Sequence, residues 1–220
     1  MRPWTKQVVL ENKEVIQLPS LYIENMKLYH GSPVPTIEAF DVNEGDQWST
    51  GKGIYLTPDK KAADGYARER GDRTPNQPTV YETEISNLDV ADLRTQGAQE
   101  SFAKLYRDAL IEFRDNTLPY LKGPTPELAG MIKKTMTEKV QQLLEKIDKH
   151  DFRQLRELTV NFADLTTETL AKAGYHGLVS IEGEPPKIEF HDSYVIFDPK
   201  DIKITRQENI PHSGPAGVRF

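Results

Sequence analysis

LYHGS at Leu28–Ser32 and GKGIYLT at Gly51–Thr57 are the two runs from which the architecture of this chain can be inferred. The first predicts a strand that ends in an imidazole, a glycine and a hydroxyl, and glycine lets a flat ligand approach the backbone closely. GKG is not a phosphate-binding loop, because the upstream glycine spacing and a following Ser or Thr are missing. Taken alone, His30 also fits a structural, hydrogen-bonded histidine, and Gly51 with Gly53 also fits a simple turn.

Outward from these runs, the hydrophobic periodicity changes twice. Residues 27–93 hold short β-like runs and one helix, which Thr57 and Pro58 start and Gly71 ends. Helical periodicity fills residues 97–173, where Thr125 caps the longest helix and its apolar stripe, 128–147, is expected in the core. Three strands then follow, at residues 175–181, 187–197 and 201–205. This order predicts an α+β fold with a helical insertion.

Composition excludes several classes of protein. The chain has 220 residues, of which 37% are hydrophobic and 28% charged, and no apolar run is long enough to cross a membrane. Charged residues interrupt the first twenty positions, so we expect no secretory signal there. Without cysteine there is no disulfide, thiolate metal site or cysteine nucleophile, and the five histidines show no metal-ligand spacing, so no metal is expected. The net charge of −6 argues against a general phosphate-backbone binder.

Together and in this order, the motifs resemble the ADP-ribosyltransferase superfamily, in its histidine–tyrosine branch, and its small phage and mobile-element members. The matching runs are LYHGS, GKGIYLT, KAADGYA at Lys61–Ala67, AGYHGLV at Ala173–Val179 and SYVIFDPKDIK at Ser193–Lys203. The resemblance implies a split β-sandwich at residues 27–208, an N-terminal extension at 1–26 and a flexible tail at 209–220. It also implies a cytoplasmic phage or bacterial effector that uses NAD and needs no membrane.

The resemblance assigns roles by motif position. His30 would bond the adenosine ribose, and Gly31, with Ser32 beside it, would hold the nicotinamide carboxamide through its backbone. Tyr55 and Tyr66 would flank the nicotinamide ring, since aromatic faces attract a flat cation by about 1 kcal/mol each. Ordinary packing of Tyr66 on the sheet is the alternative.

The position where active relatives carry a glutamate is Ser193, and a hydroxyl brings no negative charge to the developing cation. Glu189 and His191 alternate with it on one strand face, and Glu182 lies on the turn before that strand. Each carboxylate is a candidate substitute, or simply a solvated charge.

These features favour a mono-ADP-ribosyltransferase that moves ADP-ribose from NAD to a protein or nucleic-acid acceptor and releases nicotinamide. A catalytically silent NAD or ADP-ribose binding module and an NAD glycohydrolase toxin are the alternatives. The sequence does not identify the acceptor.

Overall fold

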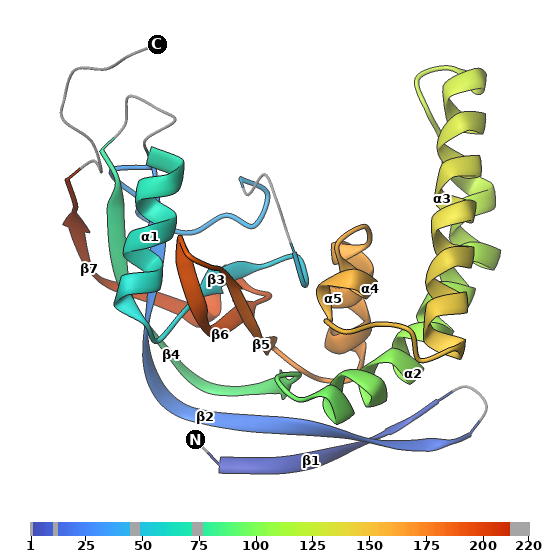
Figure 1. Cartoon of the computed structure of the whole chain (residues 1–220), viewed down its shortest axis with the longest axis horizontal. Helices are drawn as coiled ribbons and strands as arrows, with labels where there is room; N and C mark the ends of the chain where they lie inside the picture. Colours follow the sequence, from blue (N-terminus) through green and yellow to red (C-terminus); the bar gives the residue numbers. More distant parts are fainter. Residues whose placement is uncertain (1, 11–12, 45–48, 72–76, 212–220) are drawn as a thin grey trace.

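The computed structural model describes residues 2–10, 13–44, 49–71 and 77–211. Its strands are β1 (Arg2–Val9), β2 (Val15–Ser32), β3 (Ile54–Leu56), β4 (Thr79–Asp92), β5 (Gly177–Glu184), β6 (Ile188–Ile196) and β7 (Ile202–Asn209). Its α-helices are α1 (Lys60–Gly71), α2 (Gln96–Glu112), α3 (Pro126–Asp148), α4 (Arg156–Thr159) and α5 (Ala163–Lys172). Strands at both ends of the chain thus enclose a group of helices, which confirms the α+β fold with a helical insertion (Figure 1).

The strands form one mixed, hydrogen-bonded sheet that bends back on itself. β2 pairs with β1 on one side and β4 on the other, and β4 pairs with β7 near its start and with β5 in parallel near its end. β6 joins β5 to β3, and Thr57, just after β3, bridges back to Tyr29 of β2. Pairing therefore runs from β2 through β4, β5, β6 and β3 and returns to β2, so these strands surround a shared interior.

Two large apolar cores hold most of this arrangement together, and a third, smaller one lies where α1 meets the sheet. The interior core takes side chains from all five strands of the ring: Leu21, Ile23, Leu28, Ile54, Leu56, Ile85, Leu88, Val90, Val179, Tyr194 and Ile196. The second core joins the outer face of β5 and β6 to the helices, and it includes Phe102, Tyr106, Val140, Leu178 and Val195. Because burying each large apolar side chain contributes about 1.5–3 kcal/mol, the insertion is packed firmly against the sheet rather than tethered to it.

Helix α1 begins at Lys60, two residues later than the predicted start at Pro58. Thr57 is held extended by its bridge to Tyr29, with N–H···O distances of 2.7 and 2.9 Å in the two directions. Asp59 then accepts the amide of Lys61 at 2.8 Å, as a residue preceding a helix typically does. The predicted end at Gly71 is confirmed.

The prediction for the longest helix is half right. Thr125 caps α3 as expected, accepting from the amide of Leu128 at 3.2 Å, and the second half of the apolar stripe is buried. The first half is not core, since Leu128 is 41% and Met131 67% exposed. This half of α3 projects away from the sheet (Figure 1), so the sheet does not cover it.

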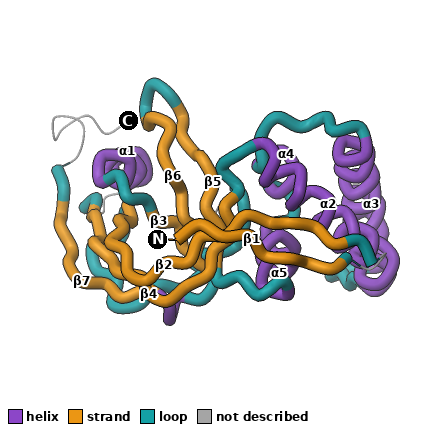
Figure 2. The backbone as a smooth tube through the Cα atoms, turned by 90° about the horizontal axis from the view of Figure 1, so that it is seen from below, coloured by secondary structure: helices purple, strands orange, loops and turns teal. Residues whose placement is uncertain are grey.

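The predicted N-terminal extension at residues 1–26 contains β1 and the first part of β2. Figure 2 shows this β1–β2 hairpin reaching the helices, where Glu14 and Lys104 approach to 3.5 Å. At the other end, Ile210 is buried and its amide donates to Pro78 O at 2.8 Å, whereas residues 212–220 of the predicted tail lie outside the described residues. The division of the chain into domains stays a prediction.

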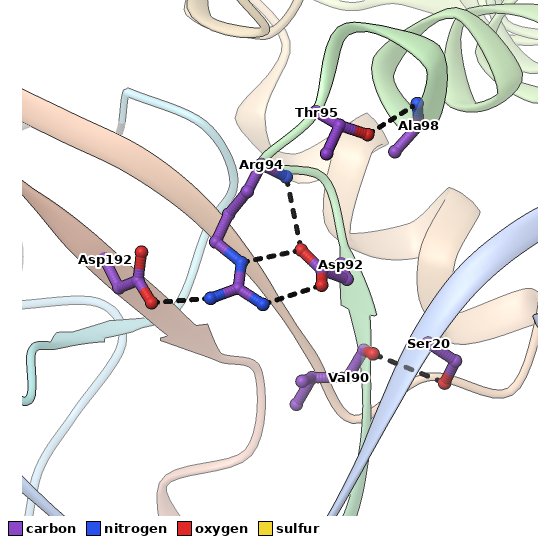
Figure 3. A network of polar contacts seen from close by, with 7 residues as sticks. All are labelled: Ser20, Val90, Asp92, Arg94, Thr95, Ala98 and Asp192. Carbon is purple, nitrogen blue, oxygen red and sulfur yellow. Dashed lines mark hydrogen bonds and ion pairs between the residues drawn. The ribbon is translucent and has the colours of Figure 1, made fainter. Parts of the chain in front are cut away.

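A charged cluster ties the end of β4 to β6 (Figure 3). Arg94 donates to both carboxylate oxygens of Asp92, at 2.8 and 2.7 Å, and to Asp192 at 2.6 Å. The hydrogen bond to Asp92, together with both negative charges, raises the pKa of Arg94 further. Asp192 lies between His191 and Ser193, so this cluster fixes the part of β6 that carries them.

None of the helices that the structure describes is long and apolar enough to cross a bilayer.

Candidate functional site

The outer face of the β5–β6 hairpin gathers several of the predicted site residues. Paired positions on this face are Leu178 with Val195, Ser180 with Ser193, and Glu182 with His191. Tyr55 of β3 is also paired with Val195, so it shares the same face at the apolar end. Because side chains alternate along the strands, this face changes from apolar at Leu178 and Val195, through the hydroxyls of Ser180 and Ser193, to the carboxylate of Glu182 and the imidazole of His191. Figure 1 shows α1 on one side of these strands and α4 and α5 on the other.

Glu182 is held by the loop that precedes β3. The hydroxyls of Ser49 and Thr50 both donate to its Oε1 atom, the second at 3.3 Å. That loop is in turn organised by Tyr55, whose hydroxyl donates to Gly51 O at 2.7 Å and accepts from the amides of Ser49 and Thr50 at 2.9 and 3.1 Å. The Tyr55 hydroxyl therefore hydrogen-bonds to backbone atoms of the loop, while its ring packs against the second core, which includes the helices.

Tyr66 and His191 lie on the α1 side of the same face. Their rings meet edge to face with centroids 5.6 Å apart. Burial raises the pKa of Tyr66, and the negative charge of Glu182, which is paired with His191 across the hairpin, raises it further. The Nδ1 atom of His191 is 2.9 Å from Glu189 O, and because a carbonyl only accepts, Nδ1 carries a proton and donates to it.

His30 adjoins Tyr55 through the backbone. Its Nδ1 atom lies 2.9 Å from Tyr55 O, so Nδ1 again carries the proton and Nε2 is the acceptor of a neutral ring. Burial lowers the pKa of His30 to about 4, and the nearby positive charge of Arg70 lowers it as well, so the ring is neutral at physiological pH. The positive charge of Arg70 also partly offsets the rise in the pKa of Tyr66. Phe40 packs edge to face on the imidazole at 5.0 Å.

Gly31 allows α1 to lie directly on β2. A Cβ atom on Gly31 would stand only 2.0 Å from Ala63 O and 2.8 Å from the backbone nitrogen of Ala67. No other residue fits this contact, because every other side chain begins with that carbon. Ser32 is buried and accepts the amide of Val34 at 3.1 Å. Gly31 and Ser32 therefore both have a structural role at the end of β2, in addition to the ligand-binding role predicted for them.

The remaining candidates differ in their surroundings. Ser193 is 3% exposed and faces Ser180, whose buried hydroxyl has no hydrogen-bond partner in the described part of the chain. The side chain of Glu189 is exposed, whereas Glu182 is partly buried and is paired with His191. Of the predicted carboxylates, Glu182 is thus the one that lies among the other site residues.

Sequence reasoning did not single out Ser49, Thr50 or Ser180. Ser49 and Thr50 immediately precede the GKG turn, but nothing in their local pattern indicates contact with a carboxylate on β5, which follows more than a hundred positions later. No three His, Asp or Glu side chains converge as a metal site within the described residues. Two cavities that the structure shows lie elsewhere, one beside Tyr29 and Lys60 and one beside Phe40 and Ile202.

Comparison with known proteins gives the family. Residues 24–211 match the family model described as "ADP-Ribosyltransferase in polyvalent proteins". No curated protein matches. Among solved structures, a chain in the M. tuberculosis MbcT–MbcA toxin–antitoxin complex is similar at 8% identity over 87% of each chain, with a TM-score of 0.46. Because the family model spans most of the sequence, this chain belongs to the ADP-ribosyltransferase family of polyvalent proteins.

Proposed function

We propose that this chain is an NAD-dependent mono-ADP-ribosyltransferase of the histidine–tyrosine type. It moves ADP-ribose from NAD to a macromolecular acceptor and releases nicotinamide. The observation that carries this proposal is the grouping at His191, which contacts Tyr66 of α1 and is paired with Glu182 of β5, beside the loop that Tyr55 organises. Family membership supports the use of NAD, and the site supplies the groups that the reaction needs.

In this proposal the rings of Tyr55 and Tyr66 flank the nicotinamide, and the free Nε2 acceptor of neutral His30 receives a ribose hydroxyl. Gly31 contributes its backbone to the carboxamide, at the end of β2 beside Ser32. These assignments follow from motif position, and the tautomer of His30 supports its part, since only an unprotonated ring nitrogen can accept a hydroxyl proton.

The chemical step breaks the bond between the ribose anomeric carbon and the nicotinamide nitrogen. Nicotinamide leaves with the bonding electron pair, positive charge develops on the ribose, and an acceptor atom then bonds to the anomeric carbon and loses its proton. Glu182 supplies the negative charge that Ser193, at the usual acid position, does not. Its Oε1 atom is fixed by two hydroxyls, and no hydrogen bond to Oε2 is found among the described residues, so Oε2 can face the ribose. Such electrostatic stabilisation is typically worth about 2.7–4 kcal/mol, or about 10²–10³ in kcat.

The experiment incubates the purified protein with NAD labelled in its adenylate half and a bacterial lysate, and measures label transfer and nicotinamide release in parallel. We expect both for the unchanged protein. We expect Glu182→Gln to lower kcat by about 10²–10³ with little change in NAD affinity, and Glu189→Gln to lower it by less than about threefold.

Four results contradict the proposal, each in a different way. Nicotinamide release without label transfer indicates a glycohydrolase, and NAD binding by calorimetry without turnover indicates a binding module. Absence of binding, transfer and release together rejects NAD as the substrate. If Glu189→Gln causes the large loss and Glu182→Gln does not, the assignment of the carboxylate is wrong.

A further inference from the structure

The loop at residues 49–52 is attached to the helical insertion at three points. Thr159 of α4 donates from Oγ1 to Ser49 O at 3.0 Å. The amide of Lys52 donates to Ala163 O, at the start of α5, at 3.2 Å, and Thr167 of α5 donates to Lys52 O at 2.8 Å. Hydrogen bonds thus hold both ends of this four-residue loop to helices that lie far away in the sequence.

The opposite side of the same loop holds Glu182. Ser49 is half-buried and Thr50 is 2% exposed, and both hydroxyls donate to a single carboxylate oxygen. A glutamate side chain has three rotatable bonds, so one anchored oxygen sets the direction in which the second oxygen points. The loop therefore connects the helical insertion to the orientation of one carboxylate.

We propose that Ser49, Thr50 and Thr167 are positioning residues for Glu182, and that the helical insertion is part of the active site because it braces them. The insertion does not touch the reacting atoms in this proposal. It holds the loop, the loop holds the carboxylate, and the carboxylate faces the substrate. The inference rests on the proposed function, since it takes Glu182 to act on NAD.

The expected effect is on turnover rather than on binding. A displacement of about 1 Å in a group that acts in the transition state can lower the rate by about 10²-fold, whereas contacts with the rest of NAD are unchanged. We therefore expect the double variant Ser49→Ala/Thr50→Val to lower kcat for nicotinamide release by about 10–100-fold. The KM for NAD and its calorimetric Kd should stay within about threefold of the unchanged protein.

The insertion is tested by a matched pair of substitutions on one helix. Thr167→Val removes the hydroxyl that reaches Lys52, and we expect it to lower kcat by about 3–10-fold. Thr169→Val removes a hydroxyl whose one hydrogen bond among the described residues is to Leu165 O within α5, at 2.6 Å, and we expect kcat to stay within about twofold. Conservative exchange of the loop hydroxyls, Ser49→Thr/Thr50→Ser, keeps both donors and should restore kcat to within about threefold.

The outcomes separate this inference from the function on which it rests. If Glu182→Gln lowers kcat but the double variant and Thr167→Val both turn over like the unchanged protein, the bracing is refuted while the proposed function stands. If Glu182→Gln itself turns over normally, the proposed role of the carboxylate fails first. Equal losses in Thr167→Val and Thr169→Val, with matching falls in melting temperature, also refute the inference, because they reflect general damage to α5.

Discussion

Replacing Gly31 by alanine should push α1 away from the sheet, because the added methyl group would meet the backbone of the helix. The added Cβ would lie 2.0 Å from Ala63 O, whereas an ordinary carbon–oxygen contact is about 3.3 Å. The helix would have to move by about 1.3 Å, and because the obstacle is backbone rather than a flexible side chain, no rotamer change can relieve it. Overpacking of this kind typically costs about 1–3 kcal/mol, so we expect a loss of about 3 kcal/mol or more.

Urea denaturation followed by circular dichroism measures this directly. For a chain of this length, 3 kcal/mol lowers the melting temperature by about 6–12 °C. The matched control is Gly130→Ala in the exposed part of α3, where a Cβ would meet nothing within 4 Å. That variant should gain about 0.5–1 kcal/mol, because alanine restricts the unfolded chain and favours helix.

The two variants should therefore shift stability in opposite directions. If the free energy of unfolding of Gly31→Ala lies within about 0.5 kcal/mol of that of the unchanged protein, α1 does not approach β2 as closely as described. The placement of Tyr66, which depends on this approach, is then wrong as well. If Gly130→Ala is destabilised to the same degree, the effect belongs to glycine replacement in general and not to the contact at Gly31.

Two further predictions concern ionisable groups. Since the pKa of His30 falls from 6.5 in the unfolded chain to about 4 in the folded protein, protonation favours unfolding, and stability should drop by at most about 3 kcal/mol as the pH falls from 6.5 to 4. Urea titrations at several pH values measure this effect. His30→Gln should lack this part of the pH dependence of the unfolding free energy, whereas His150→Asn, at an exposed position, should keep it. If the unfolding free energy of all three proteins changes equally with pH, His30 does not contribute. Arg94→Met leaves Asp92 and Asp192 close together without a cation, so we expect it to lower the free energy of unfolding by about 1–3 kcal/mol at neutral pH. Because salt screens the repulsion between the two carboxylates, part of this stability should return in 1 M salt. A loss of stability that does not change with salt would point to packing instead.

Local signals in the sequence predicted the elements well. Thr125 and Gly71 mark helix ends by chemistry that operates within a few residues, and the last three strands follow from their β-branched and aromatic alternation. The start of α1 was misplaced because Thr57 takes part in a bridge to Tyr29, a partner that the local sequence does not reveal. The exposed half of α3 was misplaced because an apolar stripe shows which face can be buried but not how far its partners extend.

The candidate site, too, could be predicted where local signals suffice and could not where long-range contacts decide. Resemblance of short motifs selected His30, Tyr55 and Tyr66, and strand alternation brought His191 and Ser193 to one face. The contact of Glu182 with Ser49 depends on β3, β5 and β6 coming together, and such long-range pairing leaves no mark in either segment. For this reason the sequence left Glu182 and Glu189 as equal candidates, whereas their surroundings in the structure differ.

The near-closed ring of strands also sets an order of events during synthesis. β3 contributes three residues and pairs with β6, where Ile54 meets Ile196. Until β6 has left the ribosome, the short strand that follows the 49–52 loop has no partner, and closing so long a loop is entropically unfavourable. A nascent chain that has completed the helices but not β6 therefore lacks the assembled candidate site, so the proposed activity can begin only once synthesis has passed that strand.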